Sequence, residues 1–292
     1  MNLEHLLNHR RVLYSLEVFP PKTTTSIDTI YNTLYGLRSL KPDFISVTYG
    51  AGGSETQKNK TCEIASLIKK EYGIEPVSHL TCIGSNKEEI RASLEQLREN
   101  GVENILALRG DRRPEIAESK DFKYASDLVA FIKEAAPDFH LIGACYPEVH
   151  GEAVSQEADI RNLKYKIEAG VSHLVTQLFF DNNRFYEFWD KCTQMGIDVP
   201  IEAGIMPVTN RSQIERMVVM CGASIPLQLR RIIEKFGDNP KALRDAGIAY
   251  AIGQIVDLVA NGVRGIHLYT MNQVETASRI TESVEYMIRS CN

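Results

Sequence analysis

Short apolar segments rich in β-branched residues alternate with amphipathic stretches along the chain. Near-continuous apolar runs are typical of parallel strands covered on both faces, because strands with one wet face alternate between apolar and polar residues. Each run is followed by a stretch of helical periodicity, so the pattern predicts repeated strand–helix units. The predicted strands are Val12–Phe19, Phe44–Tyr49, Pro76–Cys82, Asn104–Arg109, His140–Tyr146, His173–Phe180, Pro200–Met206 and Gly265–Thr270.

The stretches between the predicted strands carry helix-boundary signals. Ser85–Glu88 has the pattern of a capping box, in which the serine caps the helix and the glutamate reaches back to the cap amide. Ile90, Leu94 and Leu97 follow at the spacing of one apolar helix face. Gly101 then suits the left-handed position that ends many helices. We therefore predict a helix between the third and fourth strands.

Repeated strand–helix units without an intervening linker favour a closed barrel over an open sheet. The chain has 292 residues, and an α/β fold of the (β/α)8 TIM-type barrel class typically occupies about 250 residues. Ser224–Gly262 is long enough for two helices, so we expect an extra helix before the last strand. We predict a single catalytic barrel domain over residues 1–292. Because such barrels place the active site at the C-terminal ends of their strands, polar residues at those ends are the candidates for chemistry.

Charge and composition argue against several classes of protein. The net charge is −5 and no basic block is present, which disfavours nucleic-acid binding. No apolar run approaches the length of a membrane span, and the first residues lack the apolar segment of a signal peptide, so we expect a cytoplasmic protein. The six cysteines are scattered without a C-x-x-C pair. We therefore expect neither a disulfide framework nor a zinc or iron–sulfur site.

Glu17 is the sharpest candidate among the polar residues at the strand ends. It lies in the first predicted strand between Leu16 and Val18. Desolvation by apolar neighbours raises the pKa of a carboxyl group, and a general acid that works near neutral pH needs such a raised value. A strand-end glutamate that pairs with an arginine for structural reasons is an equally good interpretation at this point.

Other strand-end motifs are weaker. Arg109–Asp111 places a cation and an anion around a glycine, which suits a polar heterocycle, although a salt-bridged loop is the simpler interpretation. His79 is most simply a buried core histidine. Gly50–Glu55 resembles a dinucleotide-binding fingerprint but has a glutamate where the third glycine belongs. The first strand lacks the H-x-H pair of barrel metallohydrolases, so we expect no metal site.

Nine segments, in this order along the chain, resemble the methylenetetrahydrofolate reductase family. Each motif is modest alone, but together they cover nearly the whole chain. The segments are Ser15–Pro21, Ser46–Ala51, Ser78–Cys82, Ala107–Asp111, Tyr124–Leu128, Tyr146–His150, Thr176–Asp181, Gly204–Val208 and Tyr269–Asn272.

The resemblance implies a reaction and a cofactor. Non-covalent FAD, reduced by NADH, NADPH or another donor, would pass a hydride to 5,10-methylenetetrahydrofolate and give 5-methyltetrahydrofolate, in one-carbon metabolism and methionine biosynthesis. It implies a catalytic role for Glu17, as the proton donor, and for Asp111. Asp111, Gln177 and Gln213 would contact the substrate. The implied FAD contacts are Thr48, Tyr49, Ala51, His79, Arg109, Gly110, Asp111, Ala125, Tyr146, His150, Ala153, Asp159, Asn162 and Lys166.

Two positions depart from the bacterial pattern of that family. Met217 stands where many relatives carry an aromatic residue, and Gln273 stands where an arginine often follows the Tyr-Thr-x-Asn segment. These changes leave room for an unusual electron donor. We expect a homo-oligomer, and a partner subunit remains open. The alternatives are a flavin-loaded barrel subunit of a larger oxidoreductase complex acting on a pterin, or a flavin barrel that acts on another small heterocycle.

Overall fold

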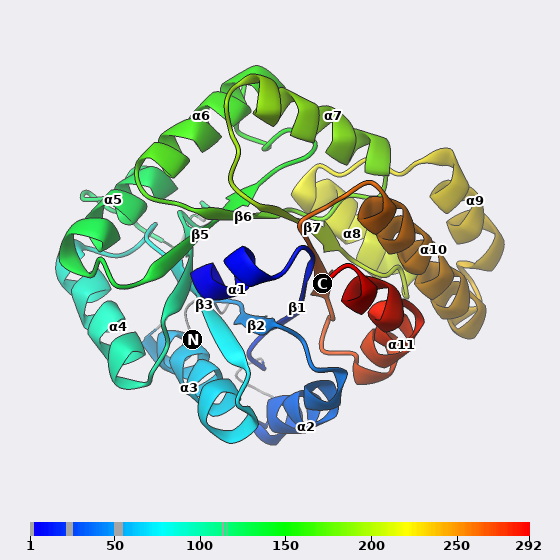
Figure 1. Ribbon diagram of the computed structural model, residues 1–292, viewed down its shortest axis with the longest axis horizontal. Coiled ribbons are helices and arrows are strands. Elements are labelled where there is room, and N and C mark those ends of the chain that lie inside the picture. Colours follow the sequence, from blue (N-terminus) through cyan, green and yellow to red (C-terminus); the bar gives the residue numbers. More distant parts are fainter. Residues whose placement is uncertain (1–2, 22–25, 50–54, 113, 115) are drawn as a thin grey trace.

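The strands close into a parallel barrel in chain order, with the last strand paired to the first (Figure 1). The computed structural model describes residues 3–21, 26–49, 55–112, 114 and 116–292. The predicted (β/α)8 barrel is therefore confirmed. The strands are β1 (Leu13–Val18), β2 (Phe44–Val47), β3 (Glu75–Thr81), β4 (Asn104–Leu108), β5 (His140–Cys145), β6 (His173–Thr176), β7 (Ile201–Ile205) and β8 (Gly265–Tyr269).

The largest departure from the predicted strands lies in β6. We expected a strand through Phe180, but β6 ends at Thr176. The apolar residues beyond it are buried for another reason, since Phe179 and Phe180 are fully buried and Phe179 stacks on Phe185 with ring centroids 5.4 Å apart. A buried loop and a buried strand share the same apolar pattern, so the pattern alone could not separate them.

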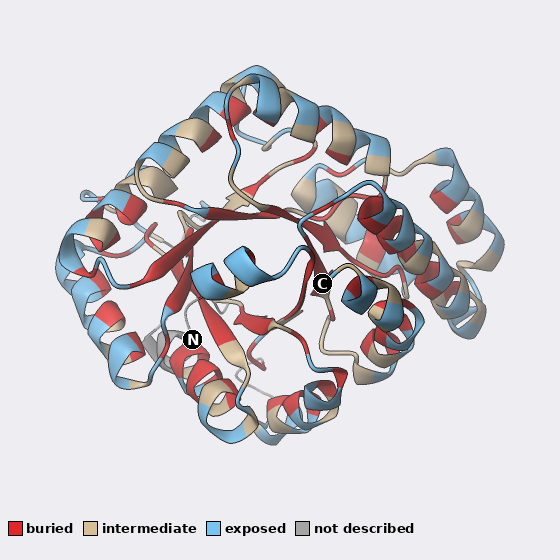
Figure 2. Cartoon of the chain, viewed as in Figure 1, coloured by how far each residue is buried: buried red, intermediate tan, exposed pale blue. Residues whose placement is uncertain are grey.

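Helices surround the barrel with their apolar faces turned inward, and α9 lies outside this ring, packed on α10 (Figures 1 and 2). The two helices expected between Ser224 and Gly262 are present as α9 and α10, which confirms the extra helix before β8. Within the described residues, no helix is both long enough and apolar enough to cross a bilayer. The elements outside the barrel are α2 (Asp28–Leu37), η1 (Arg38–Leu40), α3 (Glu55–Tyr72), α4 (Lys87–Glu99), α5 (Ala125–Ala135), α6 (Gln156–Glu168), α7 (Asn182–Gln194), α8 (Arg211–Cys221), α9 (Leu227–Phe236), α10 (Pro240–Ala260) and α11 (Val274–Ser290).

The capping box of α4 is real but lies one residue later than predicted. Asn86 is the cap, and its side-chain oxygen accepts from the Glu89 amide at 2.9 Å, while Glu89 accepts from the Asn86 amide at 3.1 Å. Ser85 is buried in the preceding turn, where its own amide donates to the Cys82 carbonyl. Gly101 has a φ of 75° after the helix end, as its left-handed role requires.

A short helix that the hydrophobic pattern did not predict covers the N-terminal end of the barrel. This helix, α1 (Leu3–His9), lies across the barrel opening in Figure 1. The Leu3 amide donates to the Asn104 side chain, at the start of β4, over 3.0 Å. Leu7 is also buried. Both leucines share an apolar cluster with barrel-interior residues, which are Leu13, Phe44, Val77, Leu106, Ile142 and Val175.

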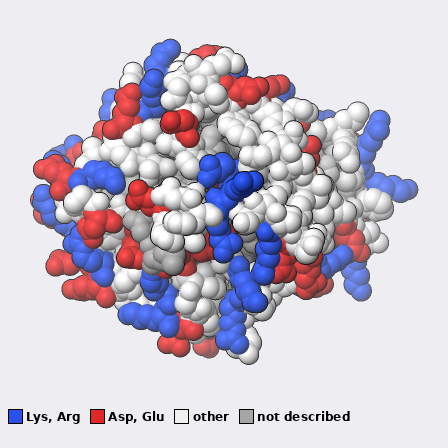
Figure 3. All heavy atoms as spheres, viewed as in Figure 1, with Lys and Arg blue, Asp and Glu red and all other residues white. Residues whose placement is uncertain are grey.

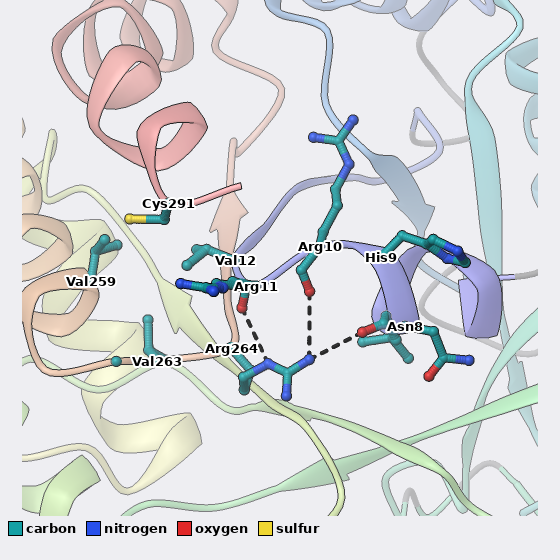
Figure 4. Close-up of a pocket in the computed structure, with 11 residues that line it drawn as sticks. Asn8, His9, Arg10, Arg11, Val12, Val259, Val263, Arg264 and Cys291 are labelled. Atoms are coloured by element: carbon teal, nitrogen blue, oxygen red, sulfur yellow. Dashed lines mark hydrogen bonds between the residues drawn. The ribbon is translucent and has the colours of Figure 1, made fainter.

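A cavity of about 580 Å³ lies beside α1 and is lined by Arg10, Arg11 and Arg264 among others. Figure 3, which views this face, shows basic side chains gathered over its middle. The Arg264 guanidinium donates to the backbone carbonyls of Leu7, Arg10 and Arg11 and so secures the end of α1 (Figure 4). Since catalytic residues of such barrels lie at the opposite, C-terminal end, this cavity is not the candidate active site.

Candidate active site

Glu17 meets two histidines where β1, β3 and β8 end. Its Oε2 lies 3.5 Å from His79 Nε2 and 3.4 Å from His267 Nε2. Ser46 on β2 donates to the same oxygen at 3.5 Å. The Glu17 side chain is 17% exposed, so it is largely buried yet reachable from the barrel mouth. Among the described residues the basic side chains that face Glu17 within 4 Å are these histidines and not an arginine, which answers the structural alternative raised by the sequence.

His79 stays uncharged near neutral pH. Burial lowers its pKa to about 4; His267 also lowers it, and the Glu17 charge opposes the shift. A neutral imidazole does not hold a neighbouring carboxyl group ionised as an arginine would. At His79, Glu17 is thus placed beside an uncharged imidazole and not beside a permanent cation.

Two buried polar atoms at this end of the barrel have no hydrogen-bond partner among the described residues. They are His79 Nε2 and the hydroxyl of Tyr49, which follows β2. Burial raises the pKa of the Tyr49 hydroxyl, so it remains a neutral donor. Because unpaired buried polar atoms are costly, such atoms point to a ligand that satisfies them.

Arg109 pairs with a neighbouring loop and not with Asp111. Its guanidinium makes two bonds of 2.7 Å to Glu152, which follows β5, and Arg112 adds a third contact at 3.1 Å. The Arg109 hydrogen bonds lower the pKa of Glu152 to about 2. Gly110 has a φ of 93°, a left-handed conformation that favours glycine. The salt-bridged loop is therefore the correct interpretation of Arg109, and Asp111 is exposed at the rim.

The predicted residues of β5 and α6 form one group beside this loop. The Tyr146 and His150 rings meet edge to face, with centroids 4.6 Å apart. Asp159 accepts from the His150 amide at 2.9 Å. Lys166 donates to the Ala144 carbonyl at 2.7 Å, and burial lowers the pKa of its ammonium group. One of the three ammonium donors of Lys166 is thus used by the backbone of β5.

The remaining predicted cofactor contacts are dispersed around the mouth. Thr48 follows β2, and its amide donates to Val18 at 2.9 Å. Ala125 opens α5 and is half-buried. Ala153 donates its amide to His150, whereas Asn162 is exposed on α6. These positions come from different loops and helices that follow the strands of the barrel. Ala51 lies outside the described residues.

Two of the three predicted substrate residues, Gln177 and Gln213, follow β6 and β7, away from Asp111 after β4. Gln177 directly follows β6, and its side-chain oxygen accepts from the Leu178 amide at 2.8 Å. Gln213 is in the first turn of α8, whose cap Asn210 accepts from the Gln213 amide at 3.0 Å. Met217, one turn further along α8, packs against the apolar cluster that contains Leu178. Both glutamines are half-buried, so their amides are accessible to a ligand.

Sequence reasoning missed Ser46 and His267, which contact Glu17. The available signal was a polar residue inside an otherwise apolar strand. Ser46 and Glu17 are paired in register, and Tyr269 is paired with Glu17 on the other side. Tyr269 is also half-buried at the mouth and donates to the Thr176 carbonyl at 2.7 Å. Within the described ranges, no group of three or more His, Cys, Asp or Glu side chains is arranged to hold a metal ion.

Comparison with known proteins gives one consistent family. The family profile "Methylenetetrahydrofolate reductase" matches residues 2–285. The 5,10-methylenetetrahydrofolate reductase of Escherichia coli K12 is 39% identical over 270 residues, which cover 92% of this chain and 90% of that protein. The enzyme of the same name from Pectobacterium carotovorum is 38% identical over 274 residues, with 94% and 90% covered. The Arabidopsis thaliana protein named methylenetetrahydrofolate reductase (NADH) 1 is 37% identical, and the match covers 90% of this chain and 47% of that longer protein.

Solved structures support the barrel fold. An uncharacterized protein from Clostridium thermocellum, described as binding two copies of 5-methyl-5,6,7,8-tetrahydrofolic acid, superposes with a TM-score of 0.69 at 16% identity, covering 98% of this chain and all of that one. A dihydropteroate synthase from Xanthomonas albilineans superposes with a TM-score of 0.54 at 15% identity, covering 95% and 93%. At such low identities these matches speak for the fold alone.

Proposed function

Because the chain belongs to the methylenetetrahydrofolate reductase family, a family of oxidoreductases, we propose that it reduces 5,10-methylenetetrahydrofolate to 5-methyltetrahydrofolate with FAD as its cofactor. The observation that carries the proposal is the placement of Glu17 beside two histidines at the C-terminal end of the barrel. NADH or NADPH is the proposed reductant. The name of the Arabidopsis relative, which includes NADH, supports a nicotinamide donor.

The donors and acceptors around the mouth fit a flavin. The unpaired Tyr49 hydroxyl and His79 Nε2 would meet its polar edge, and Tyr146 with His150 offers an aromatic surface. When bound, FAD supplies the hydride that reaches the folate. The residues that would hold it are Thr48, Tyr49, Ala51, His79, Arg109, Gly110, Asp111, Ala125, Tyr146, His150, Ala153, Asp159, Asn162 and Lys166.

Glu17 would act as the general acid. The methylene carbon between N5 and N10 of the folate is a poor hydride acceptor until N10 is protonated. Protonation opens the five-membered ring and leaves an N5 iminium group, which accepts a hydride readily. Proton donation by a positioned side chain typically contributes about 10²–10⁴ in rate. The Glu17 carboxyl group lies beside the uncharged His79 at the barrel mouth, where it is positioned to reach a bound folate.

Asp111, Gln177 and Gln213 would hold the pterin ring. An exposed carboxylate at the rim can accept hydrogen bonds from the pterin amino group and stabilise the cation that develops during ring opening. The two half-buried glutamine amides, one directly after β6 and one in α8, offer both donors and acceptors. Together they would orient the reacting carbon toward the hydride donor.

The decisive experiment follows the flavin of the purified chain through two half-reactions. The protein is reduced anaerobically with dithionite and mixed with 5,10-methylenetetrahydrofolate, for wild type, Glu17→Gln and the control Glu134→Gln, an exposed position on α5. We expect rapid reoxidation in wild type and control, and loss of it in Glu17→Gln. A wild-type flavin that folate leaves reduced would contradict the substrate assignment.

A parallel measurement identifies the reductant. The oxidised protein is mixed with NADH or NADPH under the same conditions. If neither reduces the flavin while folate reoxidises it, the chain is the flavin-loaded subunit of a larger complex, as the alternative from the sequence states. Reduction by either nucleotide establishes a self-sufficient reductase.

We also propose a cytoplasmic location and a homo-oligomeric state. All six cysteines are free, which suits a reducing compartment. The oligomeric state follows from the family resemblance, and sedimentation velocity tests it.

A further inference from the structure

A buried polar chain runs from Glu17 into the barrel interior. His267 Nε2 lies 3.4 Å from Glu17, and its Nδ1 lies 2.7 Å from Ser15 Oγ. Ser15 Oγ is in turn 2.7 Å from Glu202 Oε2, and Glu202 Oε1 lies 2.7 Å from His173 Nε2. The serine, the glutamate and both histidines are at most 1% exposed.

The barrel makes space for this carboxylate. Glu202 on β7 is paired with Gly265 on β8, and a Cβ at position 265 would approach Glu202 Cγ to 2.5 Å. A buried glutamate is expensive to keep in a core where apolar side chains would pack without penalty. The proposed reaction uses neither Glu202 nor His173, so their presence calls for a separate explanation.

The single hydroxyl proton of Ser15 couples the two ends of the chain. Ser15 lies between Glu202 and the Nδ1 atom of His267, and it can donate to only one of them. An ionised Glu202 only accepts, so Ser15 must donate to it. The Nδ1 atom of His267 then carries the proton and donates to Ser15. In the neutral imidazole this leaves a lone pair on Nε2, which faces Glu17.

The opposite protonation state reverses every donor in the chain. A protonated Glu202 donates to Ser15, and Ser15 donates to His267 Nδ1. The proton of the neutral imidazole then lies on Nε2 and points at Glu17, where it favours the carboxylate. The 3.4 Å separation from Glu17 is long for a hydrogen bond, as is common before substrate binds.

We propose that Glu202 is a positioning residue that acts on Glu17 by setting the tautomer of His267 through Ser15, so that the lone pair of His267 Nε2 faces the Glu17 carboxyl group. His173 Nε2 lies 2.7 Å from the other Glu202 oxygen and is the basic group that faces it, although the two atoms do not form a hydrogen bond of good geometry. This inference rests on the proposed role of Glu17 as proton donor. It assigns the Glu202–His173 pair a part in the reaction although neither residue reaches the mouth.

Among the described residues, four other titratable groups lie near the polar chain. Glu17 also faces His79 and Tyr269. Near Glu202 lie Asp43, whose pKa is raised mainly by burial and to a lesser extent by Glu202, and His140, whose ring centroid is 5.9 Å from that of His173. Each of these groups stays the same in the variants below, so a change in pH dependence reports the chain itself.

The test replaces Glu202 by glutamine, which has the same shape but whose amide group donates to Ser15 as a protonated acid would. We expect folate-dependent reoxidation of the flavin to be at least tenfold slower at pH 7 and to recover as the pH is lowered. The flavin content and the half-reaction with the reductant should not change. Tyr14→Phe is the matched control. Tyr14 lies next to Ser15 on β1, and the substitution removes a buried 2.7 Å bond to Thr281 that is not part of the polar chain.

A spectroscopic measurement observes the tautomer directly. ¹⁵N NMR of histidine-labelled protein should show the His267 proton on Nδ1 in wild type and on Nε2 in Glu202→Gln, with the signal assigned by its loss in His267→Gln. An unchanged tautomer, or an unchanged pH profile of reoxidation, would overturn the inference.

Ser15→Ala keeps the proposal testable if Glu202→Gln does not fold, because removal of the linking hydroxyl should by itself slow folate-dependent reoxidation at pH 7, and unchanged reoxidation would contradict the inference. Where both variants fold, Glu202→Gln should have no additional effect in the Ser15→Ala background, and additive effects would contradict the coupling. Failure of the proposed function has a separate signature, because folate would then leave the reduced flavin of the wild type unoxidised. Failure of this inference alone leaves the wild type active, Glu17→Gln inactive and the Glu202 variant normal.

Discussion

The two ends of the barrel interior contrast in chemistry. At the N-terminal end, Leu3 and Leu7 of α1 pack on barrel residues such as Phe44 and Ile142 in an apolar cluster. Toward the C-terminal end, Glu17 and His267 belong to a connected polar group. Apolar packing stabilises without specifying chemistry, whereas buried polar groups cost stability and are retained where they position a reaction. On the proposed function, the apolar cluster under α1 would serve folding and the polar group around Glu17 would serve catalysis.

Glu17→Gln should have the largest effect on activity relative to its effect on stability. The substitution removes the transferable proton while preserving side-chain volume, so turnover with folate should fall by about 10²–10⁴. The melting temperature should stay close to that of wild type, because no apolar contact is lost. Steady-state kinetics and differential scanning calorimetry on the same preparation measure both. A large drop in melting temperature with retained turnover would contradict the division.

Leu7→Ala should have the converse effect. Removing a buried leucine side chain from the cluster beneath the barrel leaves a cavity and should cost about 2–5 kcal/mol in the free energy of unfolding. The rate constant of folate reduction in the remaining folded protein should not change. Asn8→Ala, at the exposed neighbouring position, is the control, because it changes α1 without removing a buried side chain. Chemical denaturation gives the free energies of unfolding. Equal stability of both variants would show that burial of Leu7 does not stabilise the barrel.

Acid should destabilise the protein through buried histidines at both ends. Burial lowers the pKa of His140, at the start of β5, to about 3, and it lowers the pKa of His79 to about 4. The unfolded chain takes up protons near pH 6.5 and the folded chain does not, so stability decreases as the pH falls from 6.5 toward these values. Each histidine contributes about 1.4 kcal/mol per pH unit within that window.

His140→Gln sharpens this third prediction. Without the His140 imidazole, the unfolded chain takes up one proton fewer as the pH falls. The slope of the unfolding free energy against pH between 6 and 4 should therefore become shallower. Urea denaturation at a series of pH values measures the slope. An unchanged slope would mean that His140 can be protonated in the folded state.

The smallest effect should come from the rim. The Arg109 hydrogen bonds lower the pKa of Glu152 to about 2, so this pair stabilises the fold above the normal carboxyl pKa, and its contribution disappears as the pH falls toward 2. The Glu152 side chain is 42% exposed, so solvent screening limits the stabilisation to less than about 1 kcal/mol. Glu152→Gln should therefore barely change the melting temperature at pH 7. A loss of several degrees would show that this loop is part of the folding core.

Several features of the site could be anticipated from local sequence, and others could not. The positions of Glu17 and His79 followed from the rule that active residues end the strands of a barrel. The pairing of Arg109 with Glu152 did not, because it joins two loops that are 43 positions apart. The cap of α4 was misplaced by one residue, since Ser85 and Asn86 are both good caps and only the buried turn at Ser85 decides between them.

The sequence alone determined the eight strands, the order of strand and helix, and the family, because apolar periodicity and ordered motifs are properties of neighbouring residues. Tertiary structure decided which polar side chains meet. Ser15 and Glu202 are separated by 187 positions, and the closed barrel brings them within 2.7 Å through strands that are not themselves neighbours. Closure also decided that α1 covers the apolar end, because its two buried leucines match the interior of the barrel only after the strands have formed it.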